Sequence, residues 1–434
     1  MSLRGFLGGV EDKNVLKGSV DPDHELPALI SKDESKPIVF KNVKDYSNCK
    51  VASNLISSRR FLARALRTDK EDIIEKISRS IDNPEKCDRA DAKFKKVAEK
   101  PDIKKEIPVP VFYEKKNRRY FASTMVVAKD PETGVHNLSF HRLMLREENK
   151  LAIRLVKRHL YDIYNKTDGP LDVAIIMGVD PAVEVAAATS YSPDMDEFQL
   201  ANSYMDGELE VSELNDLKVP SNAEVVMFGK IKKEEVEEGP FVDLSNTWDK
   251  TRKQPAVEID ELWMKDEPYV RILLPGKGEH RNLMGVPQEP RIYKIVENTV
   301  PTVKNVVLTQ GGCSWLHGVV QMKKRNEGDP KNAGMAALAA HPSMKKVTIV
   351  DEDIDPSDQE QVEWATATRM QPDKDILFIE RAKGSSLDPS QDYENKLMTK
   401  WIVDATVPFE DKDPEEFKRA ELSKKDDIDL EDYR

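Results

Sequence analysis

The sequence predicts a multidomain protein of mixed α+β and α/β class, and three observations lead to this prediction. The chain has 434 residues, which is too long for one ordinary hydrophobic core. Strand-like segments dominate from Ile107 onward, and the last third alternates regularly between strands and helices. We expect an N-terminal α/β domain over residues 1–105, a central domain over 106–290, and a C-terminal α/β domain over 291–434 that ends in a helix.

The N-terminal part is expected to combine a strand with two helices. A short strand is predicted at 37–40 and a helix at 59–66. Thr68, with Glu71 three residues later, has the pattern of a capping box and predicts that a second helix begins there. The lysine-rich run 88–105 is expected to link domains or to form a short solvated helix.

The central part is expected to be rich in strands. β-Branched and aromatic residues favour strands at 109–113 and 120–128, and turn residues at 130–134 join the second strand to a partner at 135–145. A helix is expected over 148–164. Further strands are expected at 173–177, where an alanine-rich helix follows, and at 208–211, 223–231 and 269–274.

The C-terminal part is expected to form a largely parallel sheet, because strands and helices alternate in it. Strands are predicted at 305–308, 318–323, 347–350 and 376–379, and helices at 331–341 and 357–367. The charged tail after residue 409 is expected to form a peripheral helix with Phe417 and Leu422 as its anchors.

Composition excludes several classes of protein. The net charge of -12 argues against a general nucleic-acid binder, whose surface would be basic. No apolar run approaches the ~20 residues that a membrane span needs, and the first residues do not resemble a secretory signal, so we expect a cytoplasmic protein. The three cysteines form no CxxC pair, which argues against a disulfide framework and a thiolate zinc site.

Four polar segments could carry chemistry. Their candidate residues include an amide, an imidazole and a carboxylate, which suit a divalent metal ion. They also include an arginine and two further carboxylates, which suit acid–base work on an anionic substrate. The segments lie at 137–142 (Asn-Leu-Ser-Phe-His-Arg), 158–159 (Arg-His), 223–226 (Ala-Glu-Val-Val) and 238–243 (Glu-Gly-Pro-Phe-Val-Asp).

Each segment also has an ordinary explanation. Asn137 and Arg142 are five residues apart and would point to opposite faces of a regular strand, so a bulge or strong twist is needed if both serve one site. His159 could be a surface or core-edge residue of a helix, and Glu224 an exposed strand residue. The acidic run that ends at Glu238 could be a polar turn.

In order, spacing and residue type, these segments resemble the UbiD family of reversible decarboxylases, which use prenylated flavin mononucleotide (FMN). The resemblance extends from about residue 37 to residue 409, and three later segments share it: Gly-Gly-Cys-Ser at 311–314, Trp-Ala-Thr-Ala-Thr-Arg-Met-Gln-Pro at 364–372, and Lys-Trp-Ile-Val-Asp-Ala-Thr at 400–406. It implies that the central domain is a split β-barrel that binds the flavin and that the C-terminal domain serves oligomerisation.

The resemblance implies a metal site and a cofactor site. Asn137, His159 and Glu224 would bind Mn²⁺ or Mg²⁺, with K⁺ nearby, and the ion would hold the flavin phosphate. His136 and His141 are rivals of His159 as the imidazole ligand. The residues implied to contact prenylated FMN are Asn137, Ser139, Phe140, His141, Arg142, Arg158, His159, Glu224 and Lys400.

The resemblance also implies catalytic roles for Arg142, Glu238 and Asp243. The mechanism of the family is a 1,3-dipolar cycloaddition between the modified flavin and the double bond of an α,β-unsaturated acid. Arg142 would hold the substrate carboxylate, Glu238 would orient Arg142, and Asp243 would deliver the proton that replaces carbon dioxide. The polar loop 244–247 stands where relatives carry Thr-Gly-Tyr-Tyr, which favours a substrate other than the common aromatic acids.

The compact length resembles archaeal members of the family, which implies decarboxylation of trans-anhydromevalonate 5-phosphate to isopentenyl phosphate in isoprenoid biosynthesis. An aromatic or polyprenyl-hydroxybenzoic acid is the alternative substrate. A non-catalytic flavin-binding or assembly subunit is the alternative of another class. The implied partners are a flavin prenyltransferase that supplies the cofactor and further copies of the chain in a dimer or hexamer.

Overall fold

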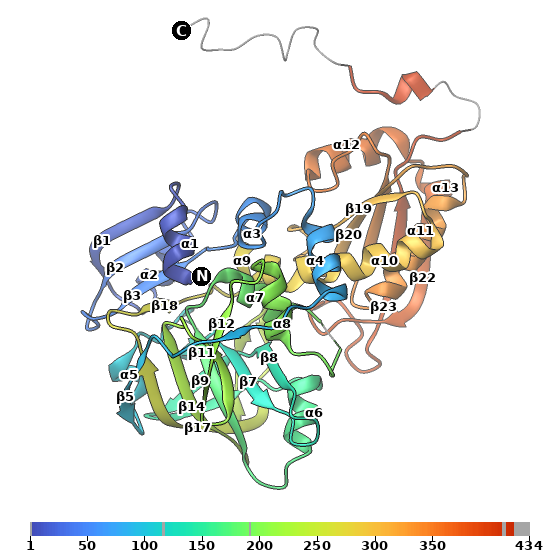
Figure 1. Ribbon diagram of the computed structural model, residues 1–434. Coiled ribbons are helices and arrows are strands. Elements are labelled where there is room, and N and C mark those ends of the chain that lie inside the picture. The colour runs from blue at the N-terminus through green and yellow to red at the C-terminus, as the bar shows by residue number, and fades with distance from the viewer. Residues whose placement is uncertain (1, 115–117, 191, 410–413, 421–434) are drawn as a thin grey trace, which may run out of the picture. The chain divides into compact units, whose positions relative to one another are not determined.

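The structure is a computed structural model that describes residues 2–114, 118–190, 192–409 and 414–420. The chain divides into two compact units, which we describe separately (Figure 1). The N-terminal unit contains Met1–Arg291 together with Gln310–Trp315 and Leu387–Pro389. The C-terminal unit contains Ile292–Thr309, Leu316–Ser386 and Ser390–Arg434.

The N-terminal unit begins with a four-stranded sheet and four helices. The sheet has the order β1 (Asn14–Val20), β2 (Ile38–Val43), β3 (Lys50–Ser53) and β18 (Tyr269–Arg271). The helices are α1 (Leu3–Gly9), α2 (Glu25–Ile30), α3 (Arg59–Ala65) and α4 (Ile73–Asp82). The expected strand at 37–40 and helix at 59–66 are confirmed as β2 and α3. The second helix begins at Ile73 after Asp72, not at the capping box of Thr68.

A nine-stranded sheet dominates this unit. Its path runs from β6 (Tyr120–Phe121) through β9 (Leu143–Glu147), β10 (Lys150–Ile153), β17 (Arg252–Met264), β14 (Val225–Glu238), β11 (Leu171–Met177) and β7 (Met125–Lys129) to β8 (His136–Phe140), while β5 (Lys95–Glu99) pairs with β17. The expected hairpin across the turn at 130–134 is confirmed by the antiparallel pairing of β7 with β8. Among the described strands the path stays open between β6 and β8 and does not close into a barrel.

Smaller elements complete the unit. A three-stranded sheet contains β13 (Leu217–Pro220), β12 (Glu210–Leu214) and β4 (Asp88–Arg89), and a two-stranded one contains β15 (Phe241–Val242) and β16 (Trp248–Asp249). The helices are α5 (Ile103–Glu106), α6 (His159–Asn165), α7 (Pro181–Ala188), α8 (Glu197–Tyr204), α9 (Gly278–Gly285), the 3-10 turn η1 (Val286–Gln288) and the first part of α10 (Glu289–Thr299).

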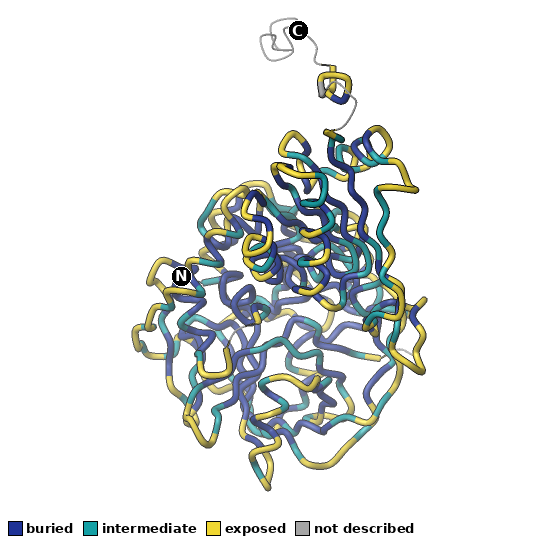
Figure 2. Tube along the Cα trace, turned by 90° about the vertical axis from the view of Figure 1, so that its right-hand side faces the viewer, coloured by how far each residue is buried: buried dark blue, intermediate teal, exposed yellow. Residues whose placement is uncertain are grey.

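Helices cover the sheet around β8. Helices α7 and α8 pack against β8 and against each other, and α6 packs against β7 and β8. The strands are mostly buried and the connecting loops mostly exposed (Figure 2). Because every residue of Ile175–Met177 is fully buried, β11 has the continuous apolar pattern of a strand covered on both faces. Helices α6, α7 and α8 thus cover β8.

A buried ion triad joins three elements of this unit. Arg271 of β18 is 1 % exposed and binds Glu184 of α7 through Nε–Oε1 at 2.9 Å and Glu279 of α9 through Nη2–Oε1 at 2.7 Å. Glu279 also accepts hydrogen bonds from the backbone N–H groups of Asn54 and Ile56. The triad fixes α9 to the sheet and to the loop after β3.

The C-terminal unit contains a five-stranded sheet. Its order is β19 (Val303–Leu308), β20 (His317–Met322), β21 (Lys346–Val350), β23 (Leu397–Asp404) and β22 (Ile376–Lys383). The pairs β20·β21 and β21·β23 are parallel, and the outer strands β19 and β22 are antiparallel to their neighbours. Of the expected strands, those at 318–323 and 347–350 pair in parallel as β20 and β21, whereas those at 305–308 and 376–379 lie at the edges and pair antiparallel. The third parallel strand, β23, was not expected. The helices include α11 (Asp329–Ala340), α12 (Gln359–Arg369), α13 (Pro372–Asp375) and the 3-10 turn η2 (Pro414–Phe417).

Several expected elements differ from the structure. The helix expected over 148–164 is wrong in its first half, where β10 pairs with β9 and β17, and only α6 is helical. The strand expected at 109–113 is reduced to an isolated bridge at Val111. The run 88–105 contains β4, β5 and α5 rather than a linker or a single helix. In the tail η2 ends at Phe417, and the proposed anchor Leu422 lies outside the described residues.

Candidate active site

The acidic segment 238–243 folds into a small hairpin at the end of β14. Glu238 is the last residue of β14, and β15 pairs with β16 through Phe241↔Asp249 and Val242↔Trp248. The turn between them is closed by hydrogen bonds from Asp243 N to Thr247 O and from Asn246 N to Asp243 O. The hairpin therefore carries three carboxylates, those of Glu238, Asp243 and Asp249, to one place.

Arg142 binds all three carboxylates. Its Nε and Nη2 donate to the two oxygens of Glu238 at 2.9 and 3.0 Å, Nη1 donates to Asp243 Oδ2 at 3.0 Å, and Nη2 also donates to Asp249 Oδ2 at 2.8 Å. The guanidinium also lies over the ring of Phe241, with 4.4 Å from Cζ to the ring centroid. The structure therefore brings the predicted residues Arg142, Glu238 and Asp243 together.

A break in the strand lets Arg142 reach this hairpin. β8 ends at Phe140 and β9 begins at Leu143, so His141 and Arg142 lie between two strands with different partners. β8 pairs with β7, whereas β9 pairs with β10 and β6. The expected bulge or twist is thus a complete change of strand partner, and Asn137 and Arg142 belong to different ends of this segment.

The charges of this cluster reinforce one another. Burial alone would lower the pKa of Arg142, but the neighbouring carboxylates outweigh it and raise the pKa above its ordinary value. Burial would raise the pKa of Asp249, yet its ion pairs with Arg252 and Arg142 hold it well below the ordinary range. Tyr120 donates its hydroxyl to Glu238 Oε1 at 3.2 Å, and burial raises the pKa of this phenol. Arg142 and Asp249 are therefore charged at neutral pH, and Tyr120 is a neutral hydrogen-bond donor.

Asn137 lies beside a carboxylate that the sequence did not single out. Its Nδ2 donates to Glu197 Oε1 at 3.0 Å, and Glu197 Oε2 accepts from the backbone N–H of Leu138 at 2.9 Å. Glu197, the first residue of α8, is 3 % exposed, and no described Lys or Arg forms an ion pair with it. Burial raises the pKa of Glu197 to about 8. A buried carboxylate without a cation suits a metal ligand.

The amide oxygen of Asn137 shares a single hydrogen-bond donor, the hydroxyl of Ser139, with the ring of His141. His141 Nδ1 lies 3.0 Å from the carbonyl oxygen of Arg154, which can only accept, so Nδ1 carries the ring proton. Burial lowers the pKa of His141 to about 4, so the ring is neutral and Nε2 is an acceptor. Ser139 Oγ lies 2.9 Å from Asn137 Oδ1 and 3.1 Å from this Nε2, but it has one proton for both. Asn137 Oδ1 therefore has lone-pair capacity for a cation.

His159 and Glu197 both lie near β8. His159 is the first residue of α6, which packs on β8, and its imidazole has no hydrogen-bond partner among the described residues. Burial lowers its pKa and favours the neutral ring that binds metals. Its rival His136 is also buried, with Nε2 unpaired among the described atoms. His141 is already engaged by Ser139 and Arg154.

The structure does not bring Glu224 to Asn137. Strand register aligns Leu138 with Val127, then Ala174, then Phe228, across three strand spacings. Glu224 directly precedes β14 and lies four residues before Phe228, so it is displaced from Leu138 by about 13 Å along the strands and about 14 Å across them. Asn137 lies one residue further away, too far to share an ion with Glu224. Its carboxylate instead accepts from Arg4 at 2.8 Å, from Lys265 at 3.2 Å and from the backbone N–H of Tyr269 at 3.1 Å.

The remaining predicted cofactor residues lie in different surroundings. Phe140 packs partly buried on the core, and Arg158 is exposed as the N-cap of α6. Lys400 belongs to β23 of the C-terminal unit, where its Nζ donates to the carbonyl of Pro342 at 2.5 Å. Burial lowers the pKa of Lys400 to about 8.

Sequence reasoning missed several residues around Arg142. Asp249 and Arg252 form a bidentate pair beside it, and Arg154 is half-buried without a side-chain partner among the described residues. Burial and the nearby arginines lower the pKa of Arg154. His280 of α9 faces Asp243, and burial lowers its pKa. These residues are far apart in sequence, and a charged residue on a strand gives no local signal of a site.

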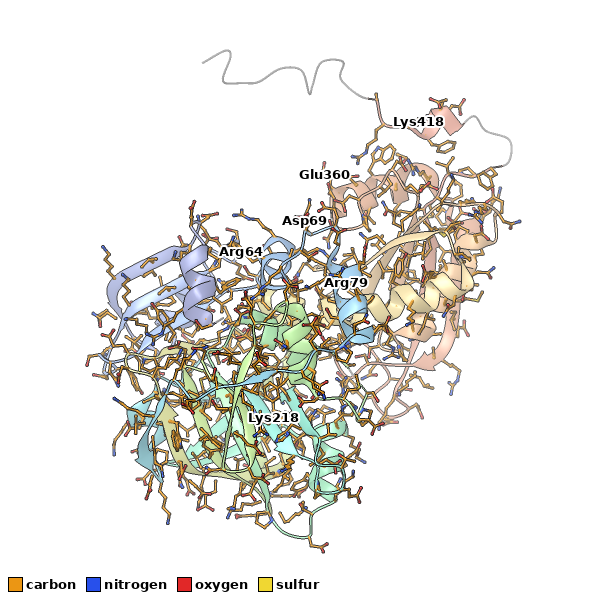
Figure 3. All side chains as sticks on the ribbon, in the orientation of Figure 1. Arg64, Asp69, Arg79, Lys218, Glu360 and Lys418 are labelled. Atoms are coloured by element: carbon orange, nitrogen blue, oxygen red, sulfur yellow. The ribbon has the colours of Figure 1, made fainter. Side chains whose placement is uncertain are left out.

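The sequence did not indicate Glu197 as a site residue, for a different reason. An acidic residue in the first turn of a helix is ordinary, because it complements the helix dipole. Its neighbour Asp196 is the N-cap of α8 and pairs with Lys218 of β13 at 2.6 Å; this lysine is labelled in Figure 3. Among the described residues, no three His, Cys, Asp or Glu side chains converge closely enough to hold a metal ion.

No helix in the described part of the chain is long and apolar enough to cross a membrane.

Comparison with known proteins gives a consistent result over the whole chain. Three family models match in order, described as the N-terminal, Rift-related and C-terminal domains of 3-octaprenyl-4-hydroxybenzoate carboxy-lyase (UbiD), at residues 12–81, 85–278 and 281–405. The chain is 45% identical to an anhydromevalonate phosphate decarboxylase of Methanocaldococcus jannaschii, covering 95% of this chain and 98% of that protein. It is 40% identical to a protein of the same name from Methanothermobacter thermautotrophicus, over 97% and 100% of the two chains.

Solved structures give the same picture. The UbiD-class enzyme HmfF of Pelotomaculum thermopropionicum in complex with FMN superposes with a TM-score of 0.96 at 32% identity, covering 100% of both chains. A dimeric evolved form of that enzyme with prenylated FMN gives 0.91 at 31% identity, again covering 100% of both chains. The mixed α/β multidomain fold is therefore that of these enzymes.

Proposed function

From the premise that the chain belongs to the UbiD family, we propose that it decarboxylates trans-anhydromevalonate 5-phosphate to isopentenyl phosphate with prenylated FMN. The observation that carries the proposal is the cluster in which Arg142 binds Glu238 and Asp243. The relatives with 40–45% identity support the substrate, since they are named anhydromevalonate phosphate decarboxylases. The FMN and prenylated FMN in HmfF support the cofactor.

The residues of the cluster supply binding and proton transfer. Bound prenylated FMN would supply the electron sink that loss of carbon dioxide requires. Arg142 holds the substrate carboxylate, because guanidinium groups suit planar carboxylates. Glu238 holds Arg142 through two hydrogen bonds and is itself 0 % exposed. Asp243, with its side chain 28% exposed, is the acid that delivers a proton to the carbon that has lost carbon dioxide.

The flavin phosphate needs a separate site. We propose that Asn137, Glu197 and His159 bind Mn²⁺ or Mg²⁺, with Glu197 in the place first predicted for Glu224. Three observations support this assignment: Asn137 donates a hydrogen bond to Glu197, no cation among the described residues pairs with Glu197, and Ser139 has only one proton to share between Asn137 Oδ1 and His141 Nε2. The ion would bind the phosphate, with Ser139, Phe140, His141 and Arg158 retained as cofactor contacts and K⁺ as a second ion.

The polar loop 244–247 supports a phosphorylated substrate over an aromatic acid. Ser245 and Thr247 share a hydrogen bond of 2.7 Å; Ser245 is half-buried and Thr247 is exposed. Arg281 of α9 reaches the carbonyl oxygen of Leu244 at 3.5 Å, so a cation lies beside the loop. An aromatic substrate would require apolar lining there. The same proposal includes the three domains with boundaries near residues 105 and 290, the central split β-barrel, a homo-oligomer, a cytoplasmic location, and cofactor supply by a flavin prenyltransferase.

The test is turnover by protein that has been co-expressed with a flavin prenyltransferase. Carbon dioxide should be released from trans-anhydromevalonate 5-phosphate and not from cinnamate or 4-hydroxybenzoate. Inorganic phosphate should inhibit competitively, because it would occupy the subsite of the substrate phosphate. Release from the aromatic acids alone, without inhibition by phosphate, would exclude the proposed substrate. Flavin binding without release from any of these acids would indicate the non-catalytic alternative.

A further inference from the structure

Arg142 has one N–H that no described residue uses. A guanidinium has five N–H donors. The Nε proton and both Nη2 protons are taken by Glu238 and Asp249, and one Nη1 proton is taken by Asp243. The second Nη1 proton has no partner among the described residues. An incoming carboxylate would therefore bind at Nη1, on the same nitrogen as Asp243.

Two of the three carboxylates on Arg142 are locked in place. Asp249 is bound by Arg252 through Nη1–Oδ2 at 2.5 Å and Nη2–Oδ1 at 2.6 Å, and it also accepts the backbone N–H of Lys250. Glu238 is fully buried and is held by two nitrogens of Arg142 and by the hydroxyl of Tyr120. Protonating either carboxylate would break at least two charge-assisted hydrogen bonds.

Asp243 is held less tightly. Only its Oδ2 contacts Arg142, while Oδ1 accepts the backbone N–H of Leu244 at 2.7 Å. Its side chain is the most exposed of the three, at 28% against 21% for Asp249 and 0% for Glu238. Asp243 can therefore gain a proton while keeping its hydrogen bond to the backbone.

A second anion at Nη1 favours such a proton. Arg142 and Arg252 form ion pairs with three carboxylates, and the nearby Arg154 only brings the cations to the same number. A substrate carboxylate at Nη1 would lie within a few ångströms of Asp243. Two carboxylates that share one site cannot both stay ionised without a large cost, and one of them takes up a proton.

The groups that face Asp243 from the surrounding elements do not offer another proton acceptor. His280 is the nearest alternative, but its Nδ1 already accepts the backbone N–H of Gly276 at 3.0 Å. Protonating this ring would destroy that hydrogen bond and add a cation beside Arg142 and Arg281. The charged groups around Asp243 and His280 are Arg142 between β8 and β9, Glu238 on β14, Asp249 on β16, Arg252 on β17 and Arg281 on α9.

We propose that the substrate carboxylate binds at the free Nη1 proton of Arg142, that Asp249 and Arg252 hold the rest of Arg142 in place, and that Asp243 takes up one proton from solvent as this carboxylate arrives. The inference rests on the proposed function and assigns Asp249 and Arg252 as positioning residues. Decarboxylation then breaks the C–C bond, and the electron pair of that bond ends in a new C–H bond whose proton comes from Asp243. Asp243 is left ionised and pairs again with Nη1.

The test measures proton uptake by calorimetry on the flavin-loaded full chain. The probe is isovalerate, a saturated acid without a double bond, titrated at one pH in buffers with different heats of ionisation. We expect uptake close to one proton per acid bound, and a Kd that weakens by about tenfold per pH unit above neutrality. Asp243→Asn should still bind isovalerate, but without uptake and with a Kd independent of pH. Binding without uptake by the natural chain, or uptake that persists in Asp243→Asn, would overturn the inference.

A second pair of variants tests the positioning residues. In the Asp243→Asn background, Arg252→Met frees Asp249 from its cation, so Asp249 should become the proton acceptor and uptake should return. Arg252→Lys keeps a positive charge there and should leave uptake absent. Equal proton uptake by both double variants would show that Arg252 does not position Asp249. Carbon dioxide release without proton uptake refutes the inference alone, whereas absence of both binding and release refutes the proposed function as well.

Discussion

Substitutions of Glu197 and Glu224 should have opposite effects, because the two buried carboxylates have different partners. Among the described residues Glu197 accepts hydrogen bonds from Asn137 and the backbone of Leu138 and has no cation, whereas Glu224 pairs with the cations Arg4 and Lys265. We expect Glu197→Gln to lose divalent metal and flavin together while the free energy of unfolding of the metal-free chain changes by no more than about 1 kcal/mol. Glu224→Gln should retain both ligands and unfold more easily.

The magnitudes follow from the contacts. Breaking a buried ion pair by removing one partner costs about 3–5 kcal/mol. The side chain of Lys265 is 11% exposed and that of Arg4 is 41% exposed, so solvent screens part of this cost and we expect about 3 kcal/mol for Glu224→Gln. For Glu197→Gln the loss of an anionic ligand should weaken metal binding by more than the about 10- to 100-fold that follows loss of an outer hydrogen-bond partner.

The assay combines elemental analysis for metal, absorbance for flavin, and urea unfolding of the metal-free protein for both variants. Each variant is the control for the other, since both replace a buried glutamate by glutamine. If Glu224→Gln lost metal and flavin while Glu197→Gln kept them, the register argument and the assignment of Glu197 would both be refuted.

Three further predictions concern the cluster and its supports. Asp243→Asn should keep its flavin and lose about 10²- to 10⁴-fold in turnover, because it has no transferable proton; turnover near the natural rate would place the donor elsewhere. Gly276 has a φ of 72°, and a Cβ there would lie 2.9 Å from Asn246 Oδ1. Gly276→Ala should therefore cost about 1–3 kcal/mol in unfolding free energy and reduce turnover by moving the loop that carries Asp243; unfolding and kinetics that match the natural chain would contradict the close packing. Arg271→Met should destabilise the chain by about 3–5 kcal/mol at neutral pH, because two buried carboxylates lose their cation. These carboxyls would bind protons more strongly folded than unfolded, so the deficit should shrink as pH falls from 8 to 5, and a deficit independent of pH would show that lost packing is the cause.

The resemblance predicted that Arg142, Glu238 and Asp243 would act together, and the structure brings their side chains into contact. Glu238 and Asp243 lie in one short segment, at the end of β14 and in the turn between β15 and β16. Arg142 comes from a distant segment, and a regular strand would have turned it away from Asn137. The change of strand partner after Phe140 depends on the pairing of β9 with β10, which no local pattern reveals.

The same pairing explains the largest error in secondary structure. Residues 148–158 carry one acidic and four basic side chains, which favour a solvated helix, but Leu151, Ala152 and Ile153 are fully buried between β9 and β17. Burial of three consecutive apolar residues in the sheet outweighs a local preference for helix that is worth only tenths of a kcal/mol per residue. A short buried strand flanked by charge cannot be distinguished from a helix by periodicity alone.

The position of β8 explains why one chain segment can serve two proposed sites. Asn137 lies within the strand, opposite Ala128, and its amide meets Glu197 on α8. Ser139 lies within hydrogen-bond distance of both Asn137 and His141, and His141 donates to the carbonyl oxygen of Arg154. His141 directly precedes Arg142 in the sequence. The end that would bind metal and phosphate is thus connected to the end that holds the substrate carboxylate. A cofactor that spans the segment would place its phosphate and its reacting ring at separate ends, and Ser139 and His141 would fix the distance between them. A substitution such as Ser139→Ala should therefore affect cofactor affinity and turnover together, whereas Asp243→Asn should affect turnover alone.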